Sequence, residues 1–246
     1  MRRATILAVA LLAFAGGANA ITFDFDATHP DPFADGSKCQ TPELASSGGY
    51  VYQWPSKYDL VFSPWDYPQF IWRCDKSGFL SFPSDFELKP TEKEAVAAFL
   101  KTKGSDPLKG LELIGLARRM EEIYAVRETD DEFKAFMLRY MAWQLRADPE
   151  ADAYRRKALG LHKKMLDGGT LSGFALQETL FILGHYSYRF GDKAAAQAYF
   201  DRIKTVEVKD EDTGQTVKGS EYLEGLAAEV LAGQADDTVR FKSDTP

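Results

Sequence analysis

The spacing of apolar positions changes near residue 88 and divides the chain into two parts. Before that point, short aromatic and β-branched runs alternate with prolines and glycines, a pattern typical of small strands and turns. The predicted strands are Tyr50–Tyr52, Leu60–Phe62, Phe70–Trp72 and Phe79–Phe82. After that point, apolar residues recur three or four positions apart, as they do in amphipathic helices. The sequence therefore predicts a mainly α-helical protein with a small β-rich N-terminal module.

Helix start and stop signals divide the second part further. Residues 91–94 form a capping-box pattern, and Asp106 and Asp148 each precede a proline, which favours a helix start. A further helix is predicted to open at Asp130 or Asp131. Additional helices are predicted at 172–190, 193–204 and 220–231, with a polar hairpin at 206–218. We expect five segments: a signal peptide (1–20), an acidic extended lead-in (21–38), a β-rich cysteine module (39–88), a helical domain (89–232) and a flexible tail (233–246).

The first twenty residues have the composition of a secretion signal. Residues 1–3 carry two arginines, residues 5–15 are apolar, and Ala18-Asn19-Ala20 fits the small-residue rule for cleavage after Ala20. Cleavage leaves 28 basic residues against 37 acidic ones, a formal charge of −9. This balance argues against nucleic-acid binding, which needs clustered basic residues. No later apolar run approaches the roughly 20 residues of a membrane span. We therefore expect a periplasmic or secreted protein.

Two cysteines, Cys39 and Cys74, follow the predicted signal. In an oxidising compartment an even number of cysteines indicates a disulfide, and two unpaired thiols are the alternative. The bridge would enclose 34 residues, a loop whose closure is worth roughly 3–4 kcal/mol.

Residues 177–210 carry the spacing of one tetratricopeptide repeat. Leu180, Leu183, Gly184, Gly191, Ala196 and Phe200 stand at its apolar and small positions. The small residues allow two antiparallel helices to approach closely, and the phenylalanine fills the space beside them. Such repeats bury their faces against neighbours, so the helices within 107–167 should stack on this pair.

The chain as a whole resembles a bacterial family catalogued as domain of unknown function 2225, across roughly residues 36–205. The shared features are the cysteine module, a Cys-x-x-Ser-Gly-Phe turn at 74–79, the acidic-aromatic stretch 84–87 and the late repeat. Family members carry two Cys-x-x-Cys zinc knuckles, whereas this chain reads Cys-Gln-Thr-Pro at 39–42 and Cys-Asp-Lys-Ser at 74–77. A structural zinc site needs four ligands, so the resemblance implies that a disulfide has replaced the metal. It implies no known activity.

In the usual repeat layout, the first helix lines a concave groove. Its groove residues here would be Glu178, Phe181, His185, Tyr188 and Arg189. Such a surface would grip a peptide or a partner's helix, with aromatic anchors and an arginine that pairs with a carboxylate. The alternative is that neighbouring helices cover these side chains as ordinary interior contacts.

The aromatic residues of the N-terminal module offer a second hypothesis. Trp54 and Trp65 each lie beside a proline and could stack on sugar rings, which predicts a glycan- or peptidoglycan-binding protein or a cryptic hydrolase. The alternative is that these aromatics form the core of a module with little aliphatic content. Phosphate loops, zinc-binding helices and nucleophile elbows are absent from the sequence, so we assign no catalytic residue, metal or cofactor. The leading hypothesis is an exported helical-repeat scaffold that binds an envelope protein or peptide.

Overall fold

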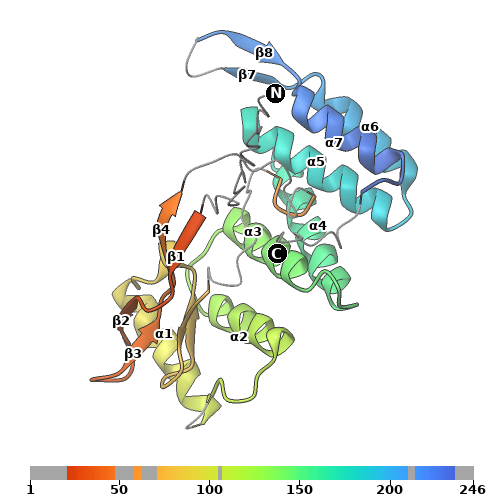
Figure 1. The fold of residues 1–246 in the computed structure, drawn as a ribbon. Coiled ribbons are helices and arrows are strands. Elements are labelled where there is room, and N and C mark those ends of the chain that lie inside the picture. Colours follow the sequence, from red (N-terminus) through yellow and green to blue (C-terminus); the bar gives the residue numbers. More distant parts are fainter. Residues whose placement is uncertain (1–20, 48–57, 62–70, 105–106, 210–213, 236–246) are drawn as a thin grey trace, which may run out of the picture.

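The computed structural model describes residues 21–47, 58–61, 71–104, 107–209 and 214–235 (Figure 1). The strands are β1 (Ile21–Asp24), β2 (Thr28–Pro30), β3 (Lys38–Gln40), β4 (Glu43–Ser47), β5 (Trp72–Cys74), β6 (Phe79–Ser81), β7 (Glu207–Lys209) and β8 (Thr216–Lys218). The helices are α1 (Pro90–Leu100), α2 (Leu113–Ala125), α3 (Asp131–Gln144), α4 (Ala151–Asp167), α5 (Gly173–Arg189), α6 (Lys193–Ile203) and α7 (Glu221–Leu231), with short 3₁₀ turns at Pro83–Asp85 and Lys101–Lys103. The chain is mainly helical, as predicted.

A small antiparallel sheet forms the N-terminal module, in the strand order β2–β3–β5–β6. A disulfide joins Cys39 in β3 to Cys74 in the adjacent strand β5 and confirms the predicted pairing. All three residues of β6 are buried, because this strand packs against α2. The β-rich module predicted from the sequence is therefore confirmed.

Residues 21–38 are more structured than an acidic lead-in. Strand β1 pairs with β4, and β2 pairs with β3. Between β2 and β3 the chain turns back at Gly36, whose φ of +71° is a conformation that glycine adopts without strain. The backbone N–H of Asp31 donates to the carbonyl of Ser37 across this turn, at 3.0 Å. Strands of three or four residues are too short to show the alternation that identifies a strand.

Two expected elements differ in the structure. The helix expected after Asp106-Pro107 begins only at Leu113, because Pro107–Gly110 form a turn in which Gly110 has a φ of +71° that an α-helix cannot contain. Leu60 and Val61, expected in a strand, lie in a turn instead.

The helices after residue 130 pack as consecutive hairpins, α3 with α4 and α5 with α6 (Figure 1). Asp130 accepts a hydrogen bond from the backbone of Phe133 and caps α3, as its position in the sequence predicts. In the second hairpin, a side chain added at Gly184 would overlap the ring of Phe200, so the glycine is what lets this ring lie against α5. The tight packing expected between these two helices is therefore present.

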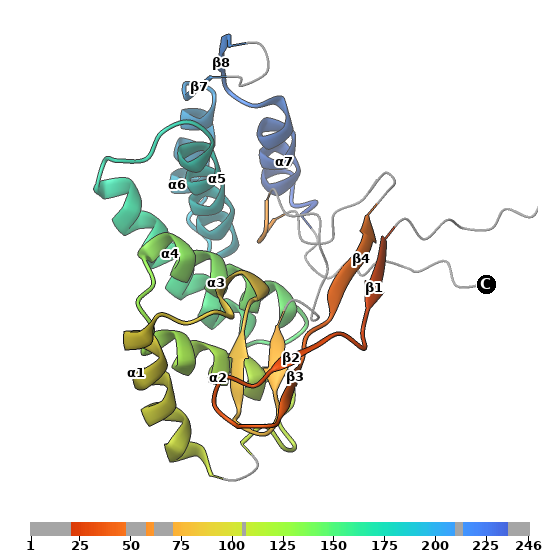
Figure 2. The ribbon, with the colours of Figure 1, turned by 90° about the vertical axis from the view of Figure 1, so that its left-hand side faces the viewer.

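One continuous hydrophobic core runs from the sheet through all the helical layers. Figure 2 shows the four-stranded sheet beside α2 at one end and α5, α6 and α7 at the other. Phe82, directly after β6, lies 5.2–5.9 Å from the rings of aromatic residues on α2 and α3. Arg127, which is buried, donates to the Ser81 hydroxyl and to the carbonyl of Asp85. The module is thus joined to the helices by both apolar and polar contacts.

Several predictions fall outside the described residues. These are the signal peptide, most of the tail, the strand at Tyr50–Tyr52 and the two tryptophans Trp54 and Trp65. Among the residues that are described, no helix has both the length and the apolar character needed to cross a bilayer.

Candidate functional site

The five predicted groove residues of α5 do not share one open surface. Phe181 and His185 are buried, with exposed fractions of 0% and 3%. Tyr188 is half-buried, and its hydroxyl donates to the carbonyl of Leu231 in α7 at 3.4 Å. Glu178 is also half-buried, and Arg189 is exposed. Phe181 and His185 are therefore interior contacts, which was the alternative to the groove, whereas Glu178 lines a cavity described below.

The covering over His185 comes from an unexpected part of the chain. Tyr58 stacks on its imidazole, with ring centroids 5.6 Å apart, and the Tyr58 hydroxyl donates to Glu229 in α7. The Tyr222 hydroxyl, also in α7, donates to the carbonyl of Val61 at 2.8 Å. Residues 58–61, which lie between the two cysteines in sequence, thus form an insert seated against α5 and α7. We call residues 58–61 the loop insert.

The loop insert is fixed by a fully buried ion pair. Both oxygens of Asp59 accept hydrogen bonds from Arg155 of α4, at 3.0 and 2.7 Å, and Tyr186 of α5 donates to one of them at 2.9 Å. Neither side chain of the pair has any solvent exposure. Burial alone would raise the pKa of Asp59, but the positive charge and hydrogen bonds of Arg155 hold that pKa below its usual value. The ionised carboxylate of Asp59 therefore anchors the loop insert. No sequence motif indicates this role for Asp59.

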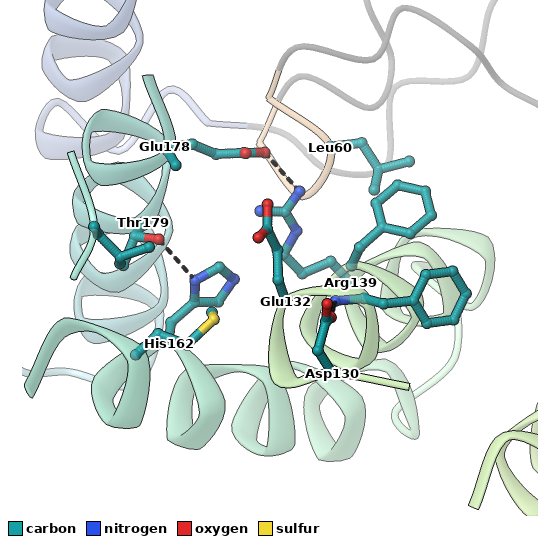
Figure 3. A pocket seen from close by; sticks show the side chains of 12 residues that line it. Leu60, Asp130, Glu132, Arg139, His162, Glu178 and Thr179 are labelled. Carbon is teal, nitrogen blue, oxygen red and sulfur yellow. Dashed lines mark hydrogen bonds and ion pairs between the residues drawn. The ribbon is translucent and has the colours of Figure 1, made fainter. Parts of the chain in front are cut away.

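A cavity of about 500 Å³ lies between α3, α4 and α5 (Figure 3). We call it the α3–α5 cavity. Its polar lining consists of Asp130, Glu132, Arg139, His162, Glu178 and Thr179. Its apolar lining consists of Leu60, Phe133, Phe136, Met165, Leu171 and Ala175. A volume of this size and a lining that mixes apolar walls with a few polar groups are typical of ligand sites.

Two polar contacts cross the α3–α5 cavity, as the dashed lines in Figure 3 show. Arg139 of α3 donates to Glu178 of α5 at 2.6 Å, and His162 of α4 lies 3.3 Å from the hydroxyl of Thr179 on α5. Arg139 Nε and His162 Nε2 are buried without a hydrogen-bond partner. A buried polar atom without a partner costs about 1–3 kcal/mol, so an occupant that supplies one would be stabilised here.

The protonation state of His162 is set by its surroundings. Burial lowers its pKa well below 6.5, and the positive charge of Arg139 lowers it further. The imidazole is therefore neutral at neutral pH, and Arg139 is the one positive charge among the lining side chains of the α3–α5 cavity.

Sequence reasoning placed Glu178 near a groove but missed Arg139 and His162. The missing signal was periodicity. His162 stands four and eight positions after Ala158 and Tyr154, both buried on the same face of α4. A histidine in that register is predicted to face the interior.

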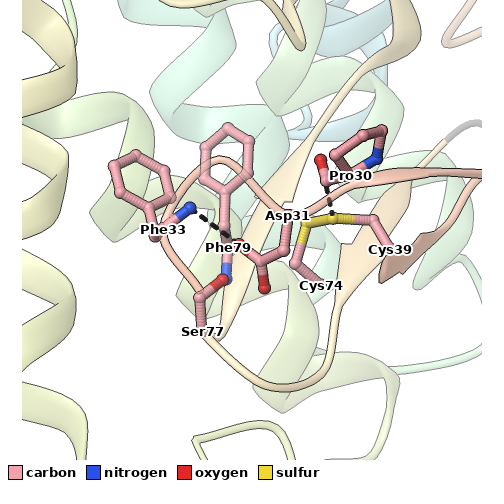
Figure 4. Close-up of a disulfide and its surroundings, with 7 residues drawn as sticks. All are labelled: Pro30, Asp31, Phe33, Cys39, Cys74, Ser77 and Phe79. Atoms are coloured by element: carbon pink, nitrogen blue, oxygen red, sulfur yellow. Dashed lines mark hydrogen bonds between the residues drawn. A yellow bond between two sulfur atoms is a disulfide. The ribbon is translucent and has the colours of Figure 1, made fainter. Parts of the chain in front are cut away.

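Asp31 lies beside the disulfide on the turn after β2 (Figure 4). Within the described ranges, Asp31, Cys39 and Cys74 are the one group whose ligand atoms lie close enough together to hold a metal ion. The two sulfurs are bonded to each other, so they are not available as thiolate ligands in this structure.

No family model, curated protein or solved structure matches the chain. The resemblance to domain of unknown function 2225 therefore stays a prediction. The glycan hypothesis also stays a prediction, because Trp54 and Trp65 lie outside the described residues.

Proposed function

We propose that this protein is an exported helical-repeat scaffold that binds a segment of a partner protein in the α3–α5 cavity. In this proposal, α3–α4 and α5–α6 are two tetratricopeptide-like hairpins, and the first helix of each contributes to one recognition surface. Arg139 from α3 and Glu178 from α5 belong to these first helices, and they meet across the cavity at 2.6 Å.

The observation that carries the proposal is the pair of unpartnered polar atoms in a cavity with apolar walls. An extended peptide offers a carbonyl and an N–H at every residue, so its backbone can pair with Arg139 Nε and His162 Nε2. Its side chains can at the same time cover half-buried Phe133 and Phe136. Peptide-binding grooves combine backbone pairing and apolar anchoring in this way.

A cavity-filling variant tests the proposal. A photo-crosslinking residue at Leu171, which lines the cavity, should give a discrete adduct in the cells that make this protein. Ala175→Trp should abolish that adduct by filling the cavity, because Ala175 is an exposed lining residue on α5.

The matched control is Ala194→Trp, a similar change at an exposed alanine on α6 away from the cavity lining. It should leave the adduct unchanged. Equal crosslinking in wild type and Ala175→Trp would contradict the proposal.

A further inference from the structure

The charge of the cavity lining indicates the chemistry of the occupant. Three carboxylates, Asp130, Glu132 and Glu178, face one guanidinium, Arg139. His162 contributes no charge at neutral pH, because burial lowers its pKa. The lining therefore carries a net charge of −2, which favours an occupant with positive charge.

The three carboxylates differ in what they already bind. Glu178 is paired with Arg139 at 2.6 Å, and Asp130 accepts the capping hydrogen bond of α3 at 2.8 Å. Glu132 is exposed in the first turn of α3 and forms no ion pair or hydrogen bond with any residue that the structure describes. A nearby cation, Lys164, is already paired with Asp131 at 2.6 Å. Glu132 is therefore the carboxylate of this site that is available to a ligand cation.

The apolar and polar walls add the second half of the description. Figure 3 shows Glu132, Arg139, Glu178 and His162 converging on the same space, with Leu60 of the loop insert on one side. Arg139 and His162 are 95% and 96% buried, and each has one nitrogen without a partner. These buried atoms provide an observation independent of the acidic side chains, and both point to an occupant with hydrogen-bonding groups.

We propose that the α3–α5 cavity selects a partner segment in which a basic side chain lies next to an apolar one. The basic group pairs with Glu132 and Asp130 at the exposed side of the cavity. The apolar side chain packs on Phe133 and Phe136, and the backbone of the segment pairs with Arg139 Nε and His162 Nε2. This inference rests on the proposed function and specifies its ligand.

The test is a selection from a random peptide library displayed on phage, with the full disulfide-bonded chain as bait. We expect the selected peptides to be enriched in Lys or Arg beside Phe, Leu or Met. Selection against Glu132→Lys should remove the basic enrichment. For one synthetic peptide from the wild-type selection, Glu132→Gln should weaken binding about twofold to fivefold, as the loss of one exposed ion pair predicts. The matched control, Glu94→Gln on α1, removes an exposed carboxylate outside the cavity and should leave affinity unchanged.

The possible outcomes separate the two proposals. Selected peptides that bind Ala175→Trp as well as wild type, or a selection that yields no peptides, would overturn the proposed function and this inference with it. Peptides that lose binding to Ala175→Trp but are acidic or uncharged would overturn the inference alone. Circular dichroism of each variant establishes that it has folded before its binding is compared.

Discussion

The Asp59–Arg155 pair should stabilise the protein only while both partners are present. Asp59→Asn removes the negative charge from beside the buried guanidinium of Arg155, which keeps its ion pair with Asp152 at 3.0 Å. Loss of one member of a buried ion pair typically costs about 3–5 kcal/mol. Because Asp152 and the retained amide compensate in part, we expect about 3 kcal/mol for Asp59→Asn. In a chain of this size that loss corresponds to a decrease in Tm of roughly 6–12 °C.

A double-mutant cycle distinguishes this effect from general damage. Asp59→Leu together with Arg155→Met replaces both charges by apolar groups but leaves the buried Tyr186 hydroxyl without its acceptor. The double variant should therefore lose about 1–3 kcal/mol, less than the sum of the two single effects. Urea denaturation of the wild type, Asp59→Leu, Arg155→Met and the double variant gives the coupling energy between the two side chains. The reasoning fails if the free energy of unfolding of Asp59→Asn lies within about 0.5 kcal/mol of the wild-type value. It also fails if the double variant loses the sum of the two single effects.

The pH dependence of the same pair has a definite sign. The pKa of Asp59 is lower in the folded state than the value of about 3.9 in an unfolded chain. Its contribution is therefore complete at neutral pH and is lost as the pH falls below about 4 through the folded pKa. The stability difference between wild type and Asp59→Asn should be constant from pH 6 to pH 8.

Three further predictions concern other parts of the fold. Gly184→Ala should lower the free energy of unfolding by about 1–3 kcal/mol, because the added methyl group overpacks the contact with Phe200. Gly160→Ala, at an exposed position of α4 with open space around it, should raise the free energy of unfolding by about 0.5–1 kcal/mol. Equal urea midpoints for the two variants would contradict this. Replacing Cys39 and Cys74 by serine should lower the free energy of unfolding by roughly 3–4 kcal/mol. Wild-type protein treated with a reductant should unfold at the same urea concentration as this variant. Free thiols in untreated protein would refute the disulfide. Burial lowers the pKa of His185 to about 4 in the folded protein. Between pH 6.5 and about pH 4 the unfolded chain therefore binds a proton at this histidine that the folded chain does not. The free energy of unfolding should fall by about 3 kcal/mol as the pH is lowered across that range. Urea unfolding of His185→Gln should show a flatter pH profile, and an unchanged profile would exclude His185 as the cause.

Local patterns predicted the helical half of the molecule well. Asp130 accepts the capping hydrogen bond that its position before an apolar run predicts. Gly184 and Phe200 pack as their spacing indicates. These features depend on residues within one or two helical turns, or on one tight hairpin, so the sequence carries them directly.

Contacts between distant segments were not predictable in the same way. Asp59 and Arg155 are 96 positions apart. Arg155 shares the buried face of α4 with Ala151 and Ala158, but no pattern identifies Asp59 as its partner. From the sequence alone, an aspartate between tyrosine and leucine, as Asp59 is, is expected in an exposed turn, because nothing nearby in the sequence indicates that Arg155 neutralises its charge. The α3–α5 cavity depends likewise on the placement of three helices relative to one another, a property that hydrophobic periodicity does not specify.

The position of the loop insert inside the disulfide-closed loop has a mechanical consequence. A force applied at β1 reaches Cys39 and crosses the disulfide to Cys74, so the 34 residues between them bear no tension along the backbone. Stretching the oxidised protein to full extension should therefore give a contour shorter than that of the reduced protein by roughly 110–120 Å. In the reduced protein the same pull would travel through the insert and load the Asp59 anchor on α4 and α5. The disulfide thus protects the anchor from tension.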